Sequence, residues 1–218
     1  MIETEVVPHP AKFGQRHLHL IVDILGDNPE LNVLDPFAGV GTIHQLPYFT
    51  RGVELEPEWA DQHPQTVVGD ALKTEFDDAC FDAVVTSPCF GNRMADNFEA
   101  KDDSIRHTYR QYLGRTPTDG SSAVLQWGDE YRNFHKKAWV EAKRVLVPHG
   151  KLVINIKNHV RAGQIQKVTE WHVEACREIG FQLTDRIQVP LPGLRHGENH
   201  EKRLPHETLL VFIKAPIV

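Results

Sequence analysis

Seven short apolar runs are distributed along the chain, and helical patterns separate most of them. Strands that are continuously apolar and alternate with helices are typical of a mainly parallel sheet covered on both faces. The last two runs are too close together for a helix between them, so we expect the final strand to be antiparallel. The pattern predicts a doubly wound α/β fold with a seven-stranded sheet, whose strands fall at residues 31–35, 52–55, 66–68, 81–86, 151–156, 182–189 and 208–213.

Two helices can be placed from their apolar spacing. One covers residues 18–25 and ends at Gly26, and the other covers residues 129–146 and ends before Pro148. The polar segments 91–128 and 190–207 do not fit the alternation of strands and helices. Insertions at strand ends carry binding loops in open α/β folds, so we expect both segments to bind substrate within one domain spanning residues 1–218.

Charge and cysteine content limit the binding partners and the cellular compartment that this chain can have. The formal net charge is −6, whereas proteins held on nucleic acid by global electrostatics are usually basic, so any such contact must come from local patches. Three cysteines without a CxxC pair, and no apolar N-terminal stretch, favour a reducing cytoplasm and no membrane. The thirteen histidines lack the partners of a zinc site, so we expect no metal.

Three consecutive strands each end in an acidic residue. The first runs into the glycine-rich turn of "VLDPFAGVGTI", which holds Asp35, Gly39 and Gly41, and the next two end at Glu54 and Asp70. Glycine permits close backbone approach to a ligand below a helix N-terminus. A carboxylate at the second strand end typically accepts ribose hydroxyls. The set predicts a pocket for an adenosine without phosphates.

These motifs resemble those of Rossmann-like S-adenosylmethionine-dependent methyltransferases, and in particular the amino methyltransferases of DNA. "HPAKF" resembles their N-terminal cofactor motif, "DPFAGVGT" the glycine motif, "GVELEP" the ribose motif, "GDAL" the adenine motif and "TSPCF" the catalytic motif. The resemblance implies S-adenosylmethionine as the cofactor. Its implied contacts are Lys12, Phe13, Asp35, Phe37, Gly39, Gly41, Thr42, Glu54, Asp70 and Ser87.

The catalytic motif reads Ser87-Pro88-Cys89-Phe90, where the family has a second proline in place of Cys89. The Ser87 hydroxyl and the Pro88 carbonyl can accept hydrogen bonds from an exocyclic amine and orient its lone pair towards the methyl group. Phe90 can stack on a base that is rotated out of the DNA duplex. The motif predicts methylation of cytosine N4 or adenine N6, and Ser87 with the direct run from "HPAKF" into the first helix favours cytosine N4.

Three alternatives remain open. A Pro-Cys dipeptide can also supply the thiolate of a cytosine-C5 methyltransferase, although the Glu-Asn-Val motif of that chemistry is absent. "FGNR" also resembles enzymes that methylate a guanine amine in RNA. The cysteine in the second-proline slot would suit a cofactor-binding subunit without activity.

The segment after the motif supplies candidate substrate contacts. Arg106 and Arg110 are four residues apart, which places them on one face of a predicted helix, and Tyr109 lies beside them for stacking. With Arg93, these residues would bind DNA, or RNA in the alternative reading. Target recognition would come from the two insertions or from a partner subunit. A separate expectation concerns residues 42–51, where Pro47 predicts a shortened or irregular crossover.

Overall fold

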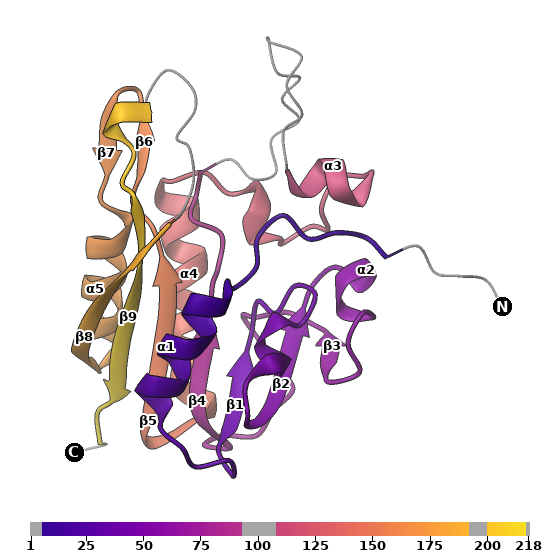
Figure 1. The fold of residues 1–218 in the computed structure, drawn as a ribbon, viewed down its shortest axis with the longest axis vertical. Coiled ribbons are helices and arrows are strands. Elements are labelled where there is room, and N and C mark those ends of the chain that lie inside the picture. The colour runs from indigo at the N-terminus through magenta and orange to yellow at the C-terminus, as the bar shows by residue number, and fades with distance from the viewer. Residues whose placement is uncertain (1–5, 93–107, 192–199, 217–218) are drawn as a thin grey trace, which may run out of the picture.

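The computed structural model describes residues 6–92, 108–191 and 200–216, which form a central seven-stranded sheet (Figure 1). The order across the sheet is β3-β2-β1-β4-β5-β9-β8. The first five strands in that order are parallel, and β9 is antiparallel to both β5 and β8. This confirms the predicted fold class. The strands are β1 (Asn32–Asp35), β2 (Phe49–Glu54), β3 (Thr66–Val68), β4 (Phe81–Thr86), β5 (Leu146–Ile156), β8 (Phe181–Pro190) and β9 (His206–Lys214).

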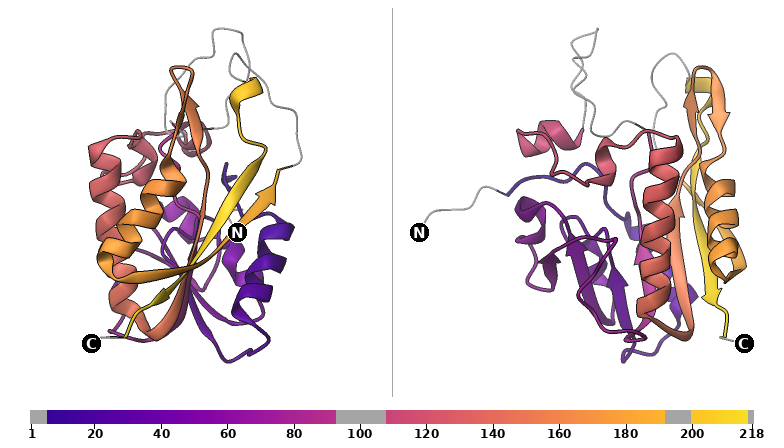
Figure 2. Two further views of the ribbon diagram at one scale, coloured as in Figure 1. Left: turned by 90° about the vertical axis from the view of Figure 1, so that its left-hand side faces the viewer. Right: turned by 180° about the vertical axis from the view of Figure 1, so that it is seen from behind.

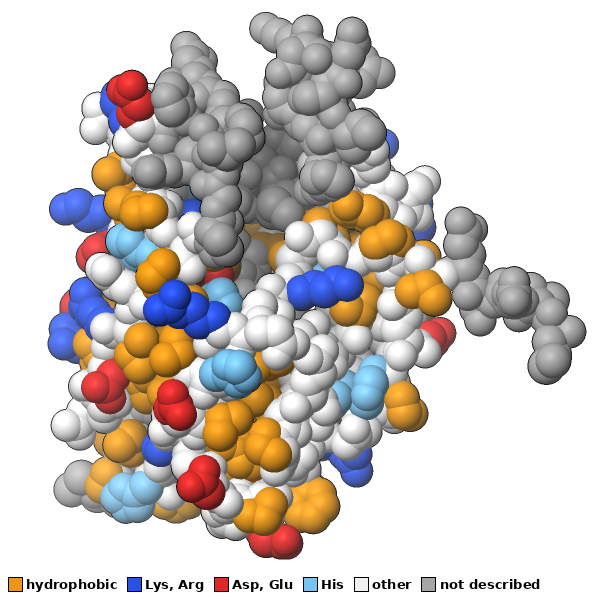
Figure 3. All heavy atoms as spheres, viewed as in Figure 1, with side chains coloured by type: hydrophobic (Ala, Val, Ile, Leu, Met, Phe, Trp, Pro, Cys, Tyr) orange, Lys and Arg blue, Asp and Glu red, His pale blue; other side chains and the backbone are white. Residues whose placement is uncertain are grey.

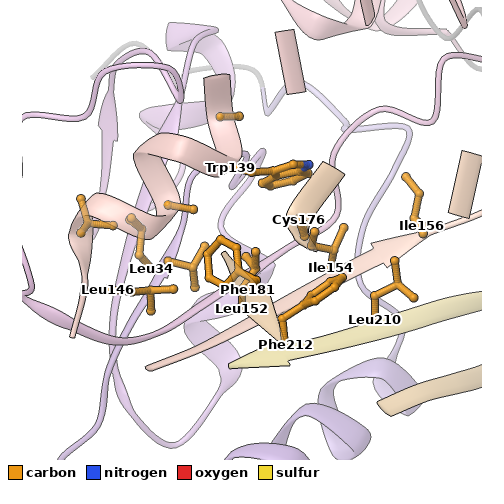
Figure 4. Packing of buried hydrophobic residues seen from close by; sticks show 14 of the residues in the cluster. Leu34, Trp139, Leu146, Leu152, Ile154, Ile156, Cys176, Phe181, Leu210 and Phe212 are labelled. Carbon is orange, nitrogen blue, oxygen red and sulfur yellow. The ribbon is translucent and has the colours of Figure 1, made fainter. Parts of the chain in front are cut away.

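Helices cover both faces of the sheet (Figure 2). The helix α1 (Gln15–Leu25) packs on one face, where Ile21 lies in a cluster with Val33 and Val153. Two helices, α4 (Asp129–Val145) and α5 (Val168–Ile179), pack on the other face. There Trp139 lies in the cluster of Leu34 and Ile154, as Figure 4 shows. Neighbouring residues of one strand therefore supply opposite halves of the core.

The crossover between β1 and β2 is short, as the sequence predicts. It contains only the 3-10 helix η1 (Thr42–Gln45). His44 compensates for the missing turns, because its ring nitrogens lie 2.8 Å from the hydroxyls of both Thr50 and Thr66. Its ring also stacks on His63 at 3.9 Å. This side chain connects the crossover to two strands of the sheet.

Two features differ from the sequence prediction. The strand β5 starts at Leu146, directly after α4, so that Pro148 and Gly150 lie inside the strand rather than before it. A second sheet, the hairpin of β6 (His159–Arg161) and β7 (Gln164–Gln166), follows β5. Its two turn residues, Ala162 and Gly163, both have positive φ, which matches a tight two-residue hairpin loop.

Short elements complete the described part of the chain. None of its helices is both long and apolar enough to cross a membrane. The remaining elements are α2 (Pro57–Ala60), α3 (Tyr109–Leu113), η2 (Ser122–Val124) and η3 (His200–Lys202).

Candidate functional site

A cavity opens at the carboxyl ends of β1, β2, β3 and β4, beside the glycine turn. We call it the glycine-turn cavity; it encloses about 740 Å³ of empty space, its open mouth included. It brings together most of the cofactor residues expected from the sequence. Those on its wall are Lys12, Phe13, Asp35, Phe37, Thr42, Glu54, Asp70 and Ser87.

Gly39 and Gly41 form the turn itself. Both have positive φ, +54° and +76°, which side chains other than glycine rarely adopt. A Cβ on Gly41 would lie 2.7 Å from the His44 ring and 2.9 Å from His63. The backbone N–H of Gly39 donates to Glu54 Oε2 at 2.9 Å. The turn therefore has to be glycine, and it is fastened to the end of the next strand.

Asp35 is the most perturbed acid in the cavity. It is only 2% exposed, and its Oδ1 accepts hydrogen bonds from the Phe37 N–H at 3.0 Å and the Thr86 hydroxyl at 2.6 Å. Burial raises the pKa of Asp35 to about 7, although both hydrogen bonds lower it. A carboxyl group in this state favours a cationic ligand, because a positive charge restores its ionised form.

Glu54 and Asp70 differ in environment. The two Glu54 oxygens accept the N–H groups of Gly39 and Glu56, and burial raises the pKa of Glu54. Each carboxylate oxygen has a further lone pair, so both can still accept a ligand hydroxyl. Asp70 is exposed and accepts the Leu72 N–H at 2.8 Å, which forms a local turn at the rim of the cavity.

The segment that closes one side of the cavity is fastened by Arg115. Its Nη2 lies 2.7 Å from Glu56 and 2.6 Å from Glu58, and Thr118 donates to Glu56 through both its N–H and its hydroxyl. This arrangement places residues 120–123 on the cavity wall. The partners of Arg115 lie 57 and 59 positions away, so the local sequence gives no sign of this pairing.

We expect Arg115→Ala to lower the free energy of unfolding by about 1–2 kcal/mol, since it leaves the buried Glu56 carboxylate without its cation. A matched control is Arg177→Ala, which breaks an exposed ion pair with Glu174 and should cost less than about 0.5 kcal/mol. Urea unfolding of both variants measures the difference. Equal losses in the two variants would mean that the Arg115 contacts have no special role in closing the cavity.

Ser87 is held from the neighbouring strands. The side-chain Nδ2 of Asn155, on β5, donates to Ser87 Oγ at 3.2 Å and to Glu207 Oε2, on β9, at 2.8 Å. His17 Nε2 lies 3.0 Å from the same Glu207 oxygen. Burial alone would raise the pKa of Glu207, but the contacts with His17 and Asn155 and the charge of Lys157 lower it. Sequence reasoning missed these partners, because nothing local links them to Ser87.

A buried chain of hydrogen bonds reaches the backbone of the motif. Trp139 Nε1 lies 3.1 Å from His172 Nδ1, and because an indole can only donate, Nδ1 is the acceptor. His172 Nε2 therefore carries the proton towards Tyr131 Oη at 2.9 Å, and Tyr131 donates in turn to the Cys89 carbonyl at 2.9 Å. Burial lowers the pKa of His172 well below its usual value, which keeps this ring neutral. The carbonyl at position 89 is thus fixed by the core.

Cys89 lies in an environment that disfavours a thiolate. Burial raises the pKa of its thiol, against hydrogen bonds with Tyr109 and Ser122 that lower it. A thiol needs a lowered pKa to act as a nucleophile near neutral pH. Cys89 borders the glycine-turn cavity, but its surroundings favour the neutral thiol.

The expected substrate residues are distributed differently. Phe90 does not border the glycine-turn cavity but borders a second cavity, which we describe below. Tyr109 is buried; its ring packs on Trp59 at 5.2 Å and it borders the glycine-turn cavity. Arg110 is partly exposed in the short helix α3. Arg93 and Arg106 lie outside the described residues.

Comparisons with known proteins identify the fold. No family model matches the chain, and no curated protein does. Among solved structures, a 1,6-didemethyltoxoflavin N1-methyltransferase from Burkholderia thailandensis, with bound S-adenosylhomocysteine, has a TM-score of 0.55 at 16% identity, over 93% of this chain and 78% of that one. A geranyl diphosphate C-methyltransferase from Streptomyces coelicolor, also with bound S-adenosylhomocysteine, has a TM-score of 0.57 at 14% identity. The match covers 92% of this chain and 80% of that one.

A third similar structure is a complex between a putative methyltransferase and the Trm112 methyltransferase activator of Haloferax volcanii. It has a TM-score of 0.55 at 14% identity, over 93% of this chain and 91% of that one. The fold of this protein is therefore that of the Rossmann-like S-adenosylmethionine-dependent methyltransferases. Since one neighbour methylates nitrogen and another carbon, the fold does not specify the acceptor.

Proposed function

We propose that this protein is a DNA methyltransferase that transfers the methyl group of S-adenosylmethionine to an exocyclic base amine, with cytosine N4 favoured over adenine N6. The proposal rests mainly on the position of residues 87–90. Ser87 borders the glycine-turn cavity, and Phe90 borders a second cavity. A motif between two cavities can bring a base against a cofactor bound on the other side.

The side chains of the glycine-turn cavity fit S-adenosylmethionine. The buried Asp35 suits a cationic amino-acid group, Glu54 suits the two ribose hydroxyls, and Phe37 with Asp70 suits the adenine. Lys12 and Thr42 lie on the same wall and would contact the methionine carboxylate. When bound, the cofactor supplies an electrophilic methyl group.

Residues 87–90 would bind and orient the base amine that accepts the methyl group. Asn155 donates to Ser87 Oγ and so fixes its direction, while a second lone pair of Ser87 accepts from the base amine. The Pro88 carbonyl accepts the other amine hydrogen, so that the nitrogen lone pair points at the methyl group. Both oxygens stabilise the positive charge that develops on nitrogen during transfer. Phe90 stacks on the base and offsets part of the cost of rotating it out of the duplex.

The environment of Cys89 supports an amine acceptor over cytosine C5. Burial raises the pKa of the thiol, whereas attack on a ring carbon requires a thiolate. The carbonyl of the same residue is engaged by Tyr131, which gives Cys89 a structural part in the motif. The proposal includes substrate contacts from residues 91–128 and 190–207, or from a partner subunit.

Mass spectrometry of nucleosides tests the proposal directly. DNA from a host that expresses the protein should contain more N4-methylcytosine, or N6-methyladenine, than DNA from the host alone, and a host that expresses Ser87→Ala should show a much smaller increase. C5-methylcytosine in place of these would establish the thiolate chemistry. A methylated guanine amine in the RNA of the same cells would move the substrate to RNA. Cofactor binding by the purified protein without any transfer would identify an inactive subunit.

A further inference from the structure

A second cavity lies beside the β6–β7 hairpin, and none of the described residues on its wall borders the glycine-turn cavity. We call it the hairpin cavity; it encloses about 850 Å³ of empty space, its open mouth included. The hairpin extends beyond the carboxyl edge of the sheet, near η3 (Figure 1). The described residues on the cavity wall are Phe90, Gly91, Asn92, Gln126, Lys157, Asn158, His159, Val160, Arg161 and Arg203.

The hairpin is anchored on three sides. Arg161 donates to the Trp127 carbonyl at 3.1 Å and to the Gln126 side chain at 3.2 Å. Lys202 donates to the Gly163 carbonyl at the hairpin turn, at 3.1 Å. At the base, Asn158 accepts the N–H of Thr169 at the start of α5, at 2.7 Å. This wall of the cavity is therefore built into the fold rather than left as an open loop.

The charge on the wall differs from that of the whole chain. Lys157, Arg161 and Arg203 border the cavity, and no acid is among its described residues. The chain as a whole has a formal net charge of −6. On the face drawn in Figure 3, acidic and basic side chains of the described residues are mixed. Three cations thus border one hollow, and Glu207 lies close enough to Lys157 for their charges to interact. Cations that line a hollow are the pattern that a phosphate-bearing ligand requires.

The cavity is next to the reacting position. Phe90 forms part of its wall, and Ser87, three residues earlier, borders the glycine-turn cavity. A base that stacks on Phe90 with its amine at Ser87 has its sugar and phosphates outside the glycine-turn cavity. Arginine can bind phosphate through two parallel hydrogen bonds. Arg161 donates to Trp127 and Gln126, but a guanidinium has five N–H donors, so further donors remain for a phosphate.

We propose that the hairpin cavity binds the phosphodiester backbone beside the target base, with Arg161 and Arg203 on the phosphates; this inference rests on the proposed DNA methyltransferase function. The hairpin then sets the position of the strand, while Phe90 and Ser87 select the base. Arg203 lies in segment 190–207, which the sequence predicts to bind substrate. Arg161 lies outside both predicted segments, because a three-residue strand pair gives little periodic signal.

The test measures binding of a fluorescein-labelled, 12-nucleotide single-stranded DNA by anisotropy between 50 and 200 mM salt. We expect Arg161→Gln and Arg203→Gln each to weaken binding roughly tenfold, and to lower the slope of log K against log salt by about 0.7. The affinity for S-adenosylhomocysteine should not change. Arg177→Gln on α5 removes one exposed charge and serves as the matched control. A peptide nucleic acid of the same sequence, which lacks phosphates, should bind the wild type and both variants equally.

Three other outcomes would contradict the phosphate-binding role of the hairpin cavity. If the wild type binds and methylates DNA but both variants match Arg177→Gln in affinity and salt slope, the hairpin cavity is not a phosphate site and the proposed function stands. Equal loss of DNA and peptide nucleic acid binding would also overturn the inference, since the charges would then act without phosphates. If the wild type does not bind DNA, or prefers RNA of the same sequence, the DNA assignment fails and the inference fails with it.

Discussion

Asp35→Asn is expected to weaken S-adenosylmethionine binding roughly 100-fold at pH 8, because the amide cannot balance the positive charge of the cofactor. The same change should stabilise the protein without ligand. Asparagine retains Oδ1, which accepts both the Phe37 and the Thr86 hydrogen bonds, and it removes the need to bury a charge. A single substitution should therefore separate ligand binding from folding.

The direction of the stability change follows from the pKa of Asp35. Burial raises this pKa from 3.8 in a model peptide to about 7 in the folded protein. The folded state thus retains a proton that the unfolded state loses, so this group's contribution to stability is complete below pH 4 and is lost as the pH rises to 7. At pH 8 we expect Asp35→Asn to be more stable than the wild type by roughly 4 kcal/mol, and at pH 4 the two should be alike.

Calorimetry and melting curves across this pH range measure both effects. Asp70→Asn is the matched control, because Asp70 also borders the cavity and accepts one backbone N–H but is exposed. It should bind the cofactor only a few-fold more weakly and gain no stability. A tightly binding Asp35→Asn would remove Asp35 from the cofactor site. A lower melting temperature at pH 8 would show that its pKa is not raised.

Ser87→Ala is expected to lower kcat by a factor of about 100 to 1000 and to leave cofactor affinity within about threefold, since it removes one acceptor for the developing charge. Cys89→Ala should keep kcat within about threefold, because the thiol has no part in the proposed reaction and the carbonyl bond to Tyr131 is unaffected. Steady-state transfer of labelled methyl groups to DNA, with cofactor titrations, measures both variants.

The opposite pattern would identify a different reaction. If Cys89→Ala were inactive and the wild type formed a covalent adduct with DNA that contains 5-fluorocytosine, the acceptor would be carbon and not nitrogen. Asn155→Ala should lower activity by an intermediate amount, because it leaves Ser87 in place but removes the side chain that donates to Ser87 Oγ. Its effect should fall on kcat and be smaller than that of Ser87→Ala.

The sequence predicts the fold because each strand has a strong local signal, and the first three strands end at a recognisable acid. The glycine turn and the acids around it can also be predicted to lie together, because parallel strands bring their carboxyl ends to one edge of the sheet. The prediction is weaker where partners are distant. Arg115 looks unpaired in its own segment, and Asn155 looks like an ordinary strand residue, because their partners are 57 and 68 positions away. The β6–β7 hairpin is too short for periodicity to indicate it.

The chain from Trp139 through His172 and Tyr131 to the Cys89 carbonyl has a consequence for how this protein can vary. Substitutions on the buried faces of α4 and α5 are usually judged by volume, and phenylalanine matches tyrosine in volume. At position 131, however, the hydroxyl that is lost is the one bound to the motif. Substitutions in this part of the core are therefore limited by hydrogen bonding as well as by volume. Two proteins whose cores are equally well filled can differ in whether the backbone of the catalytic motif is held in place.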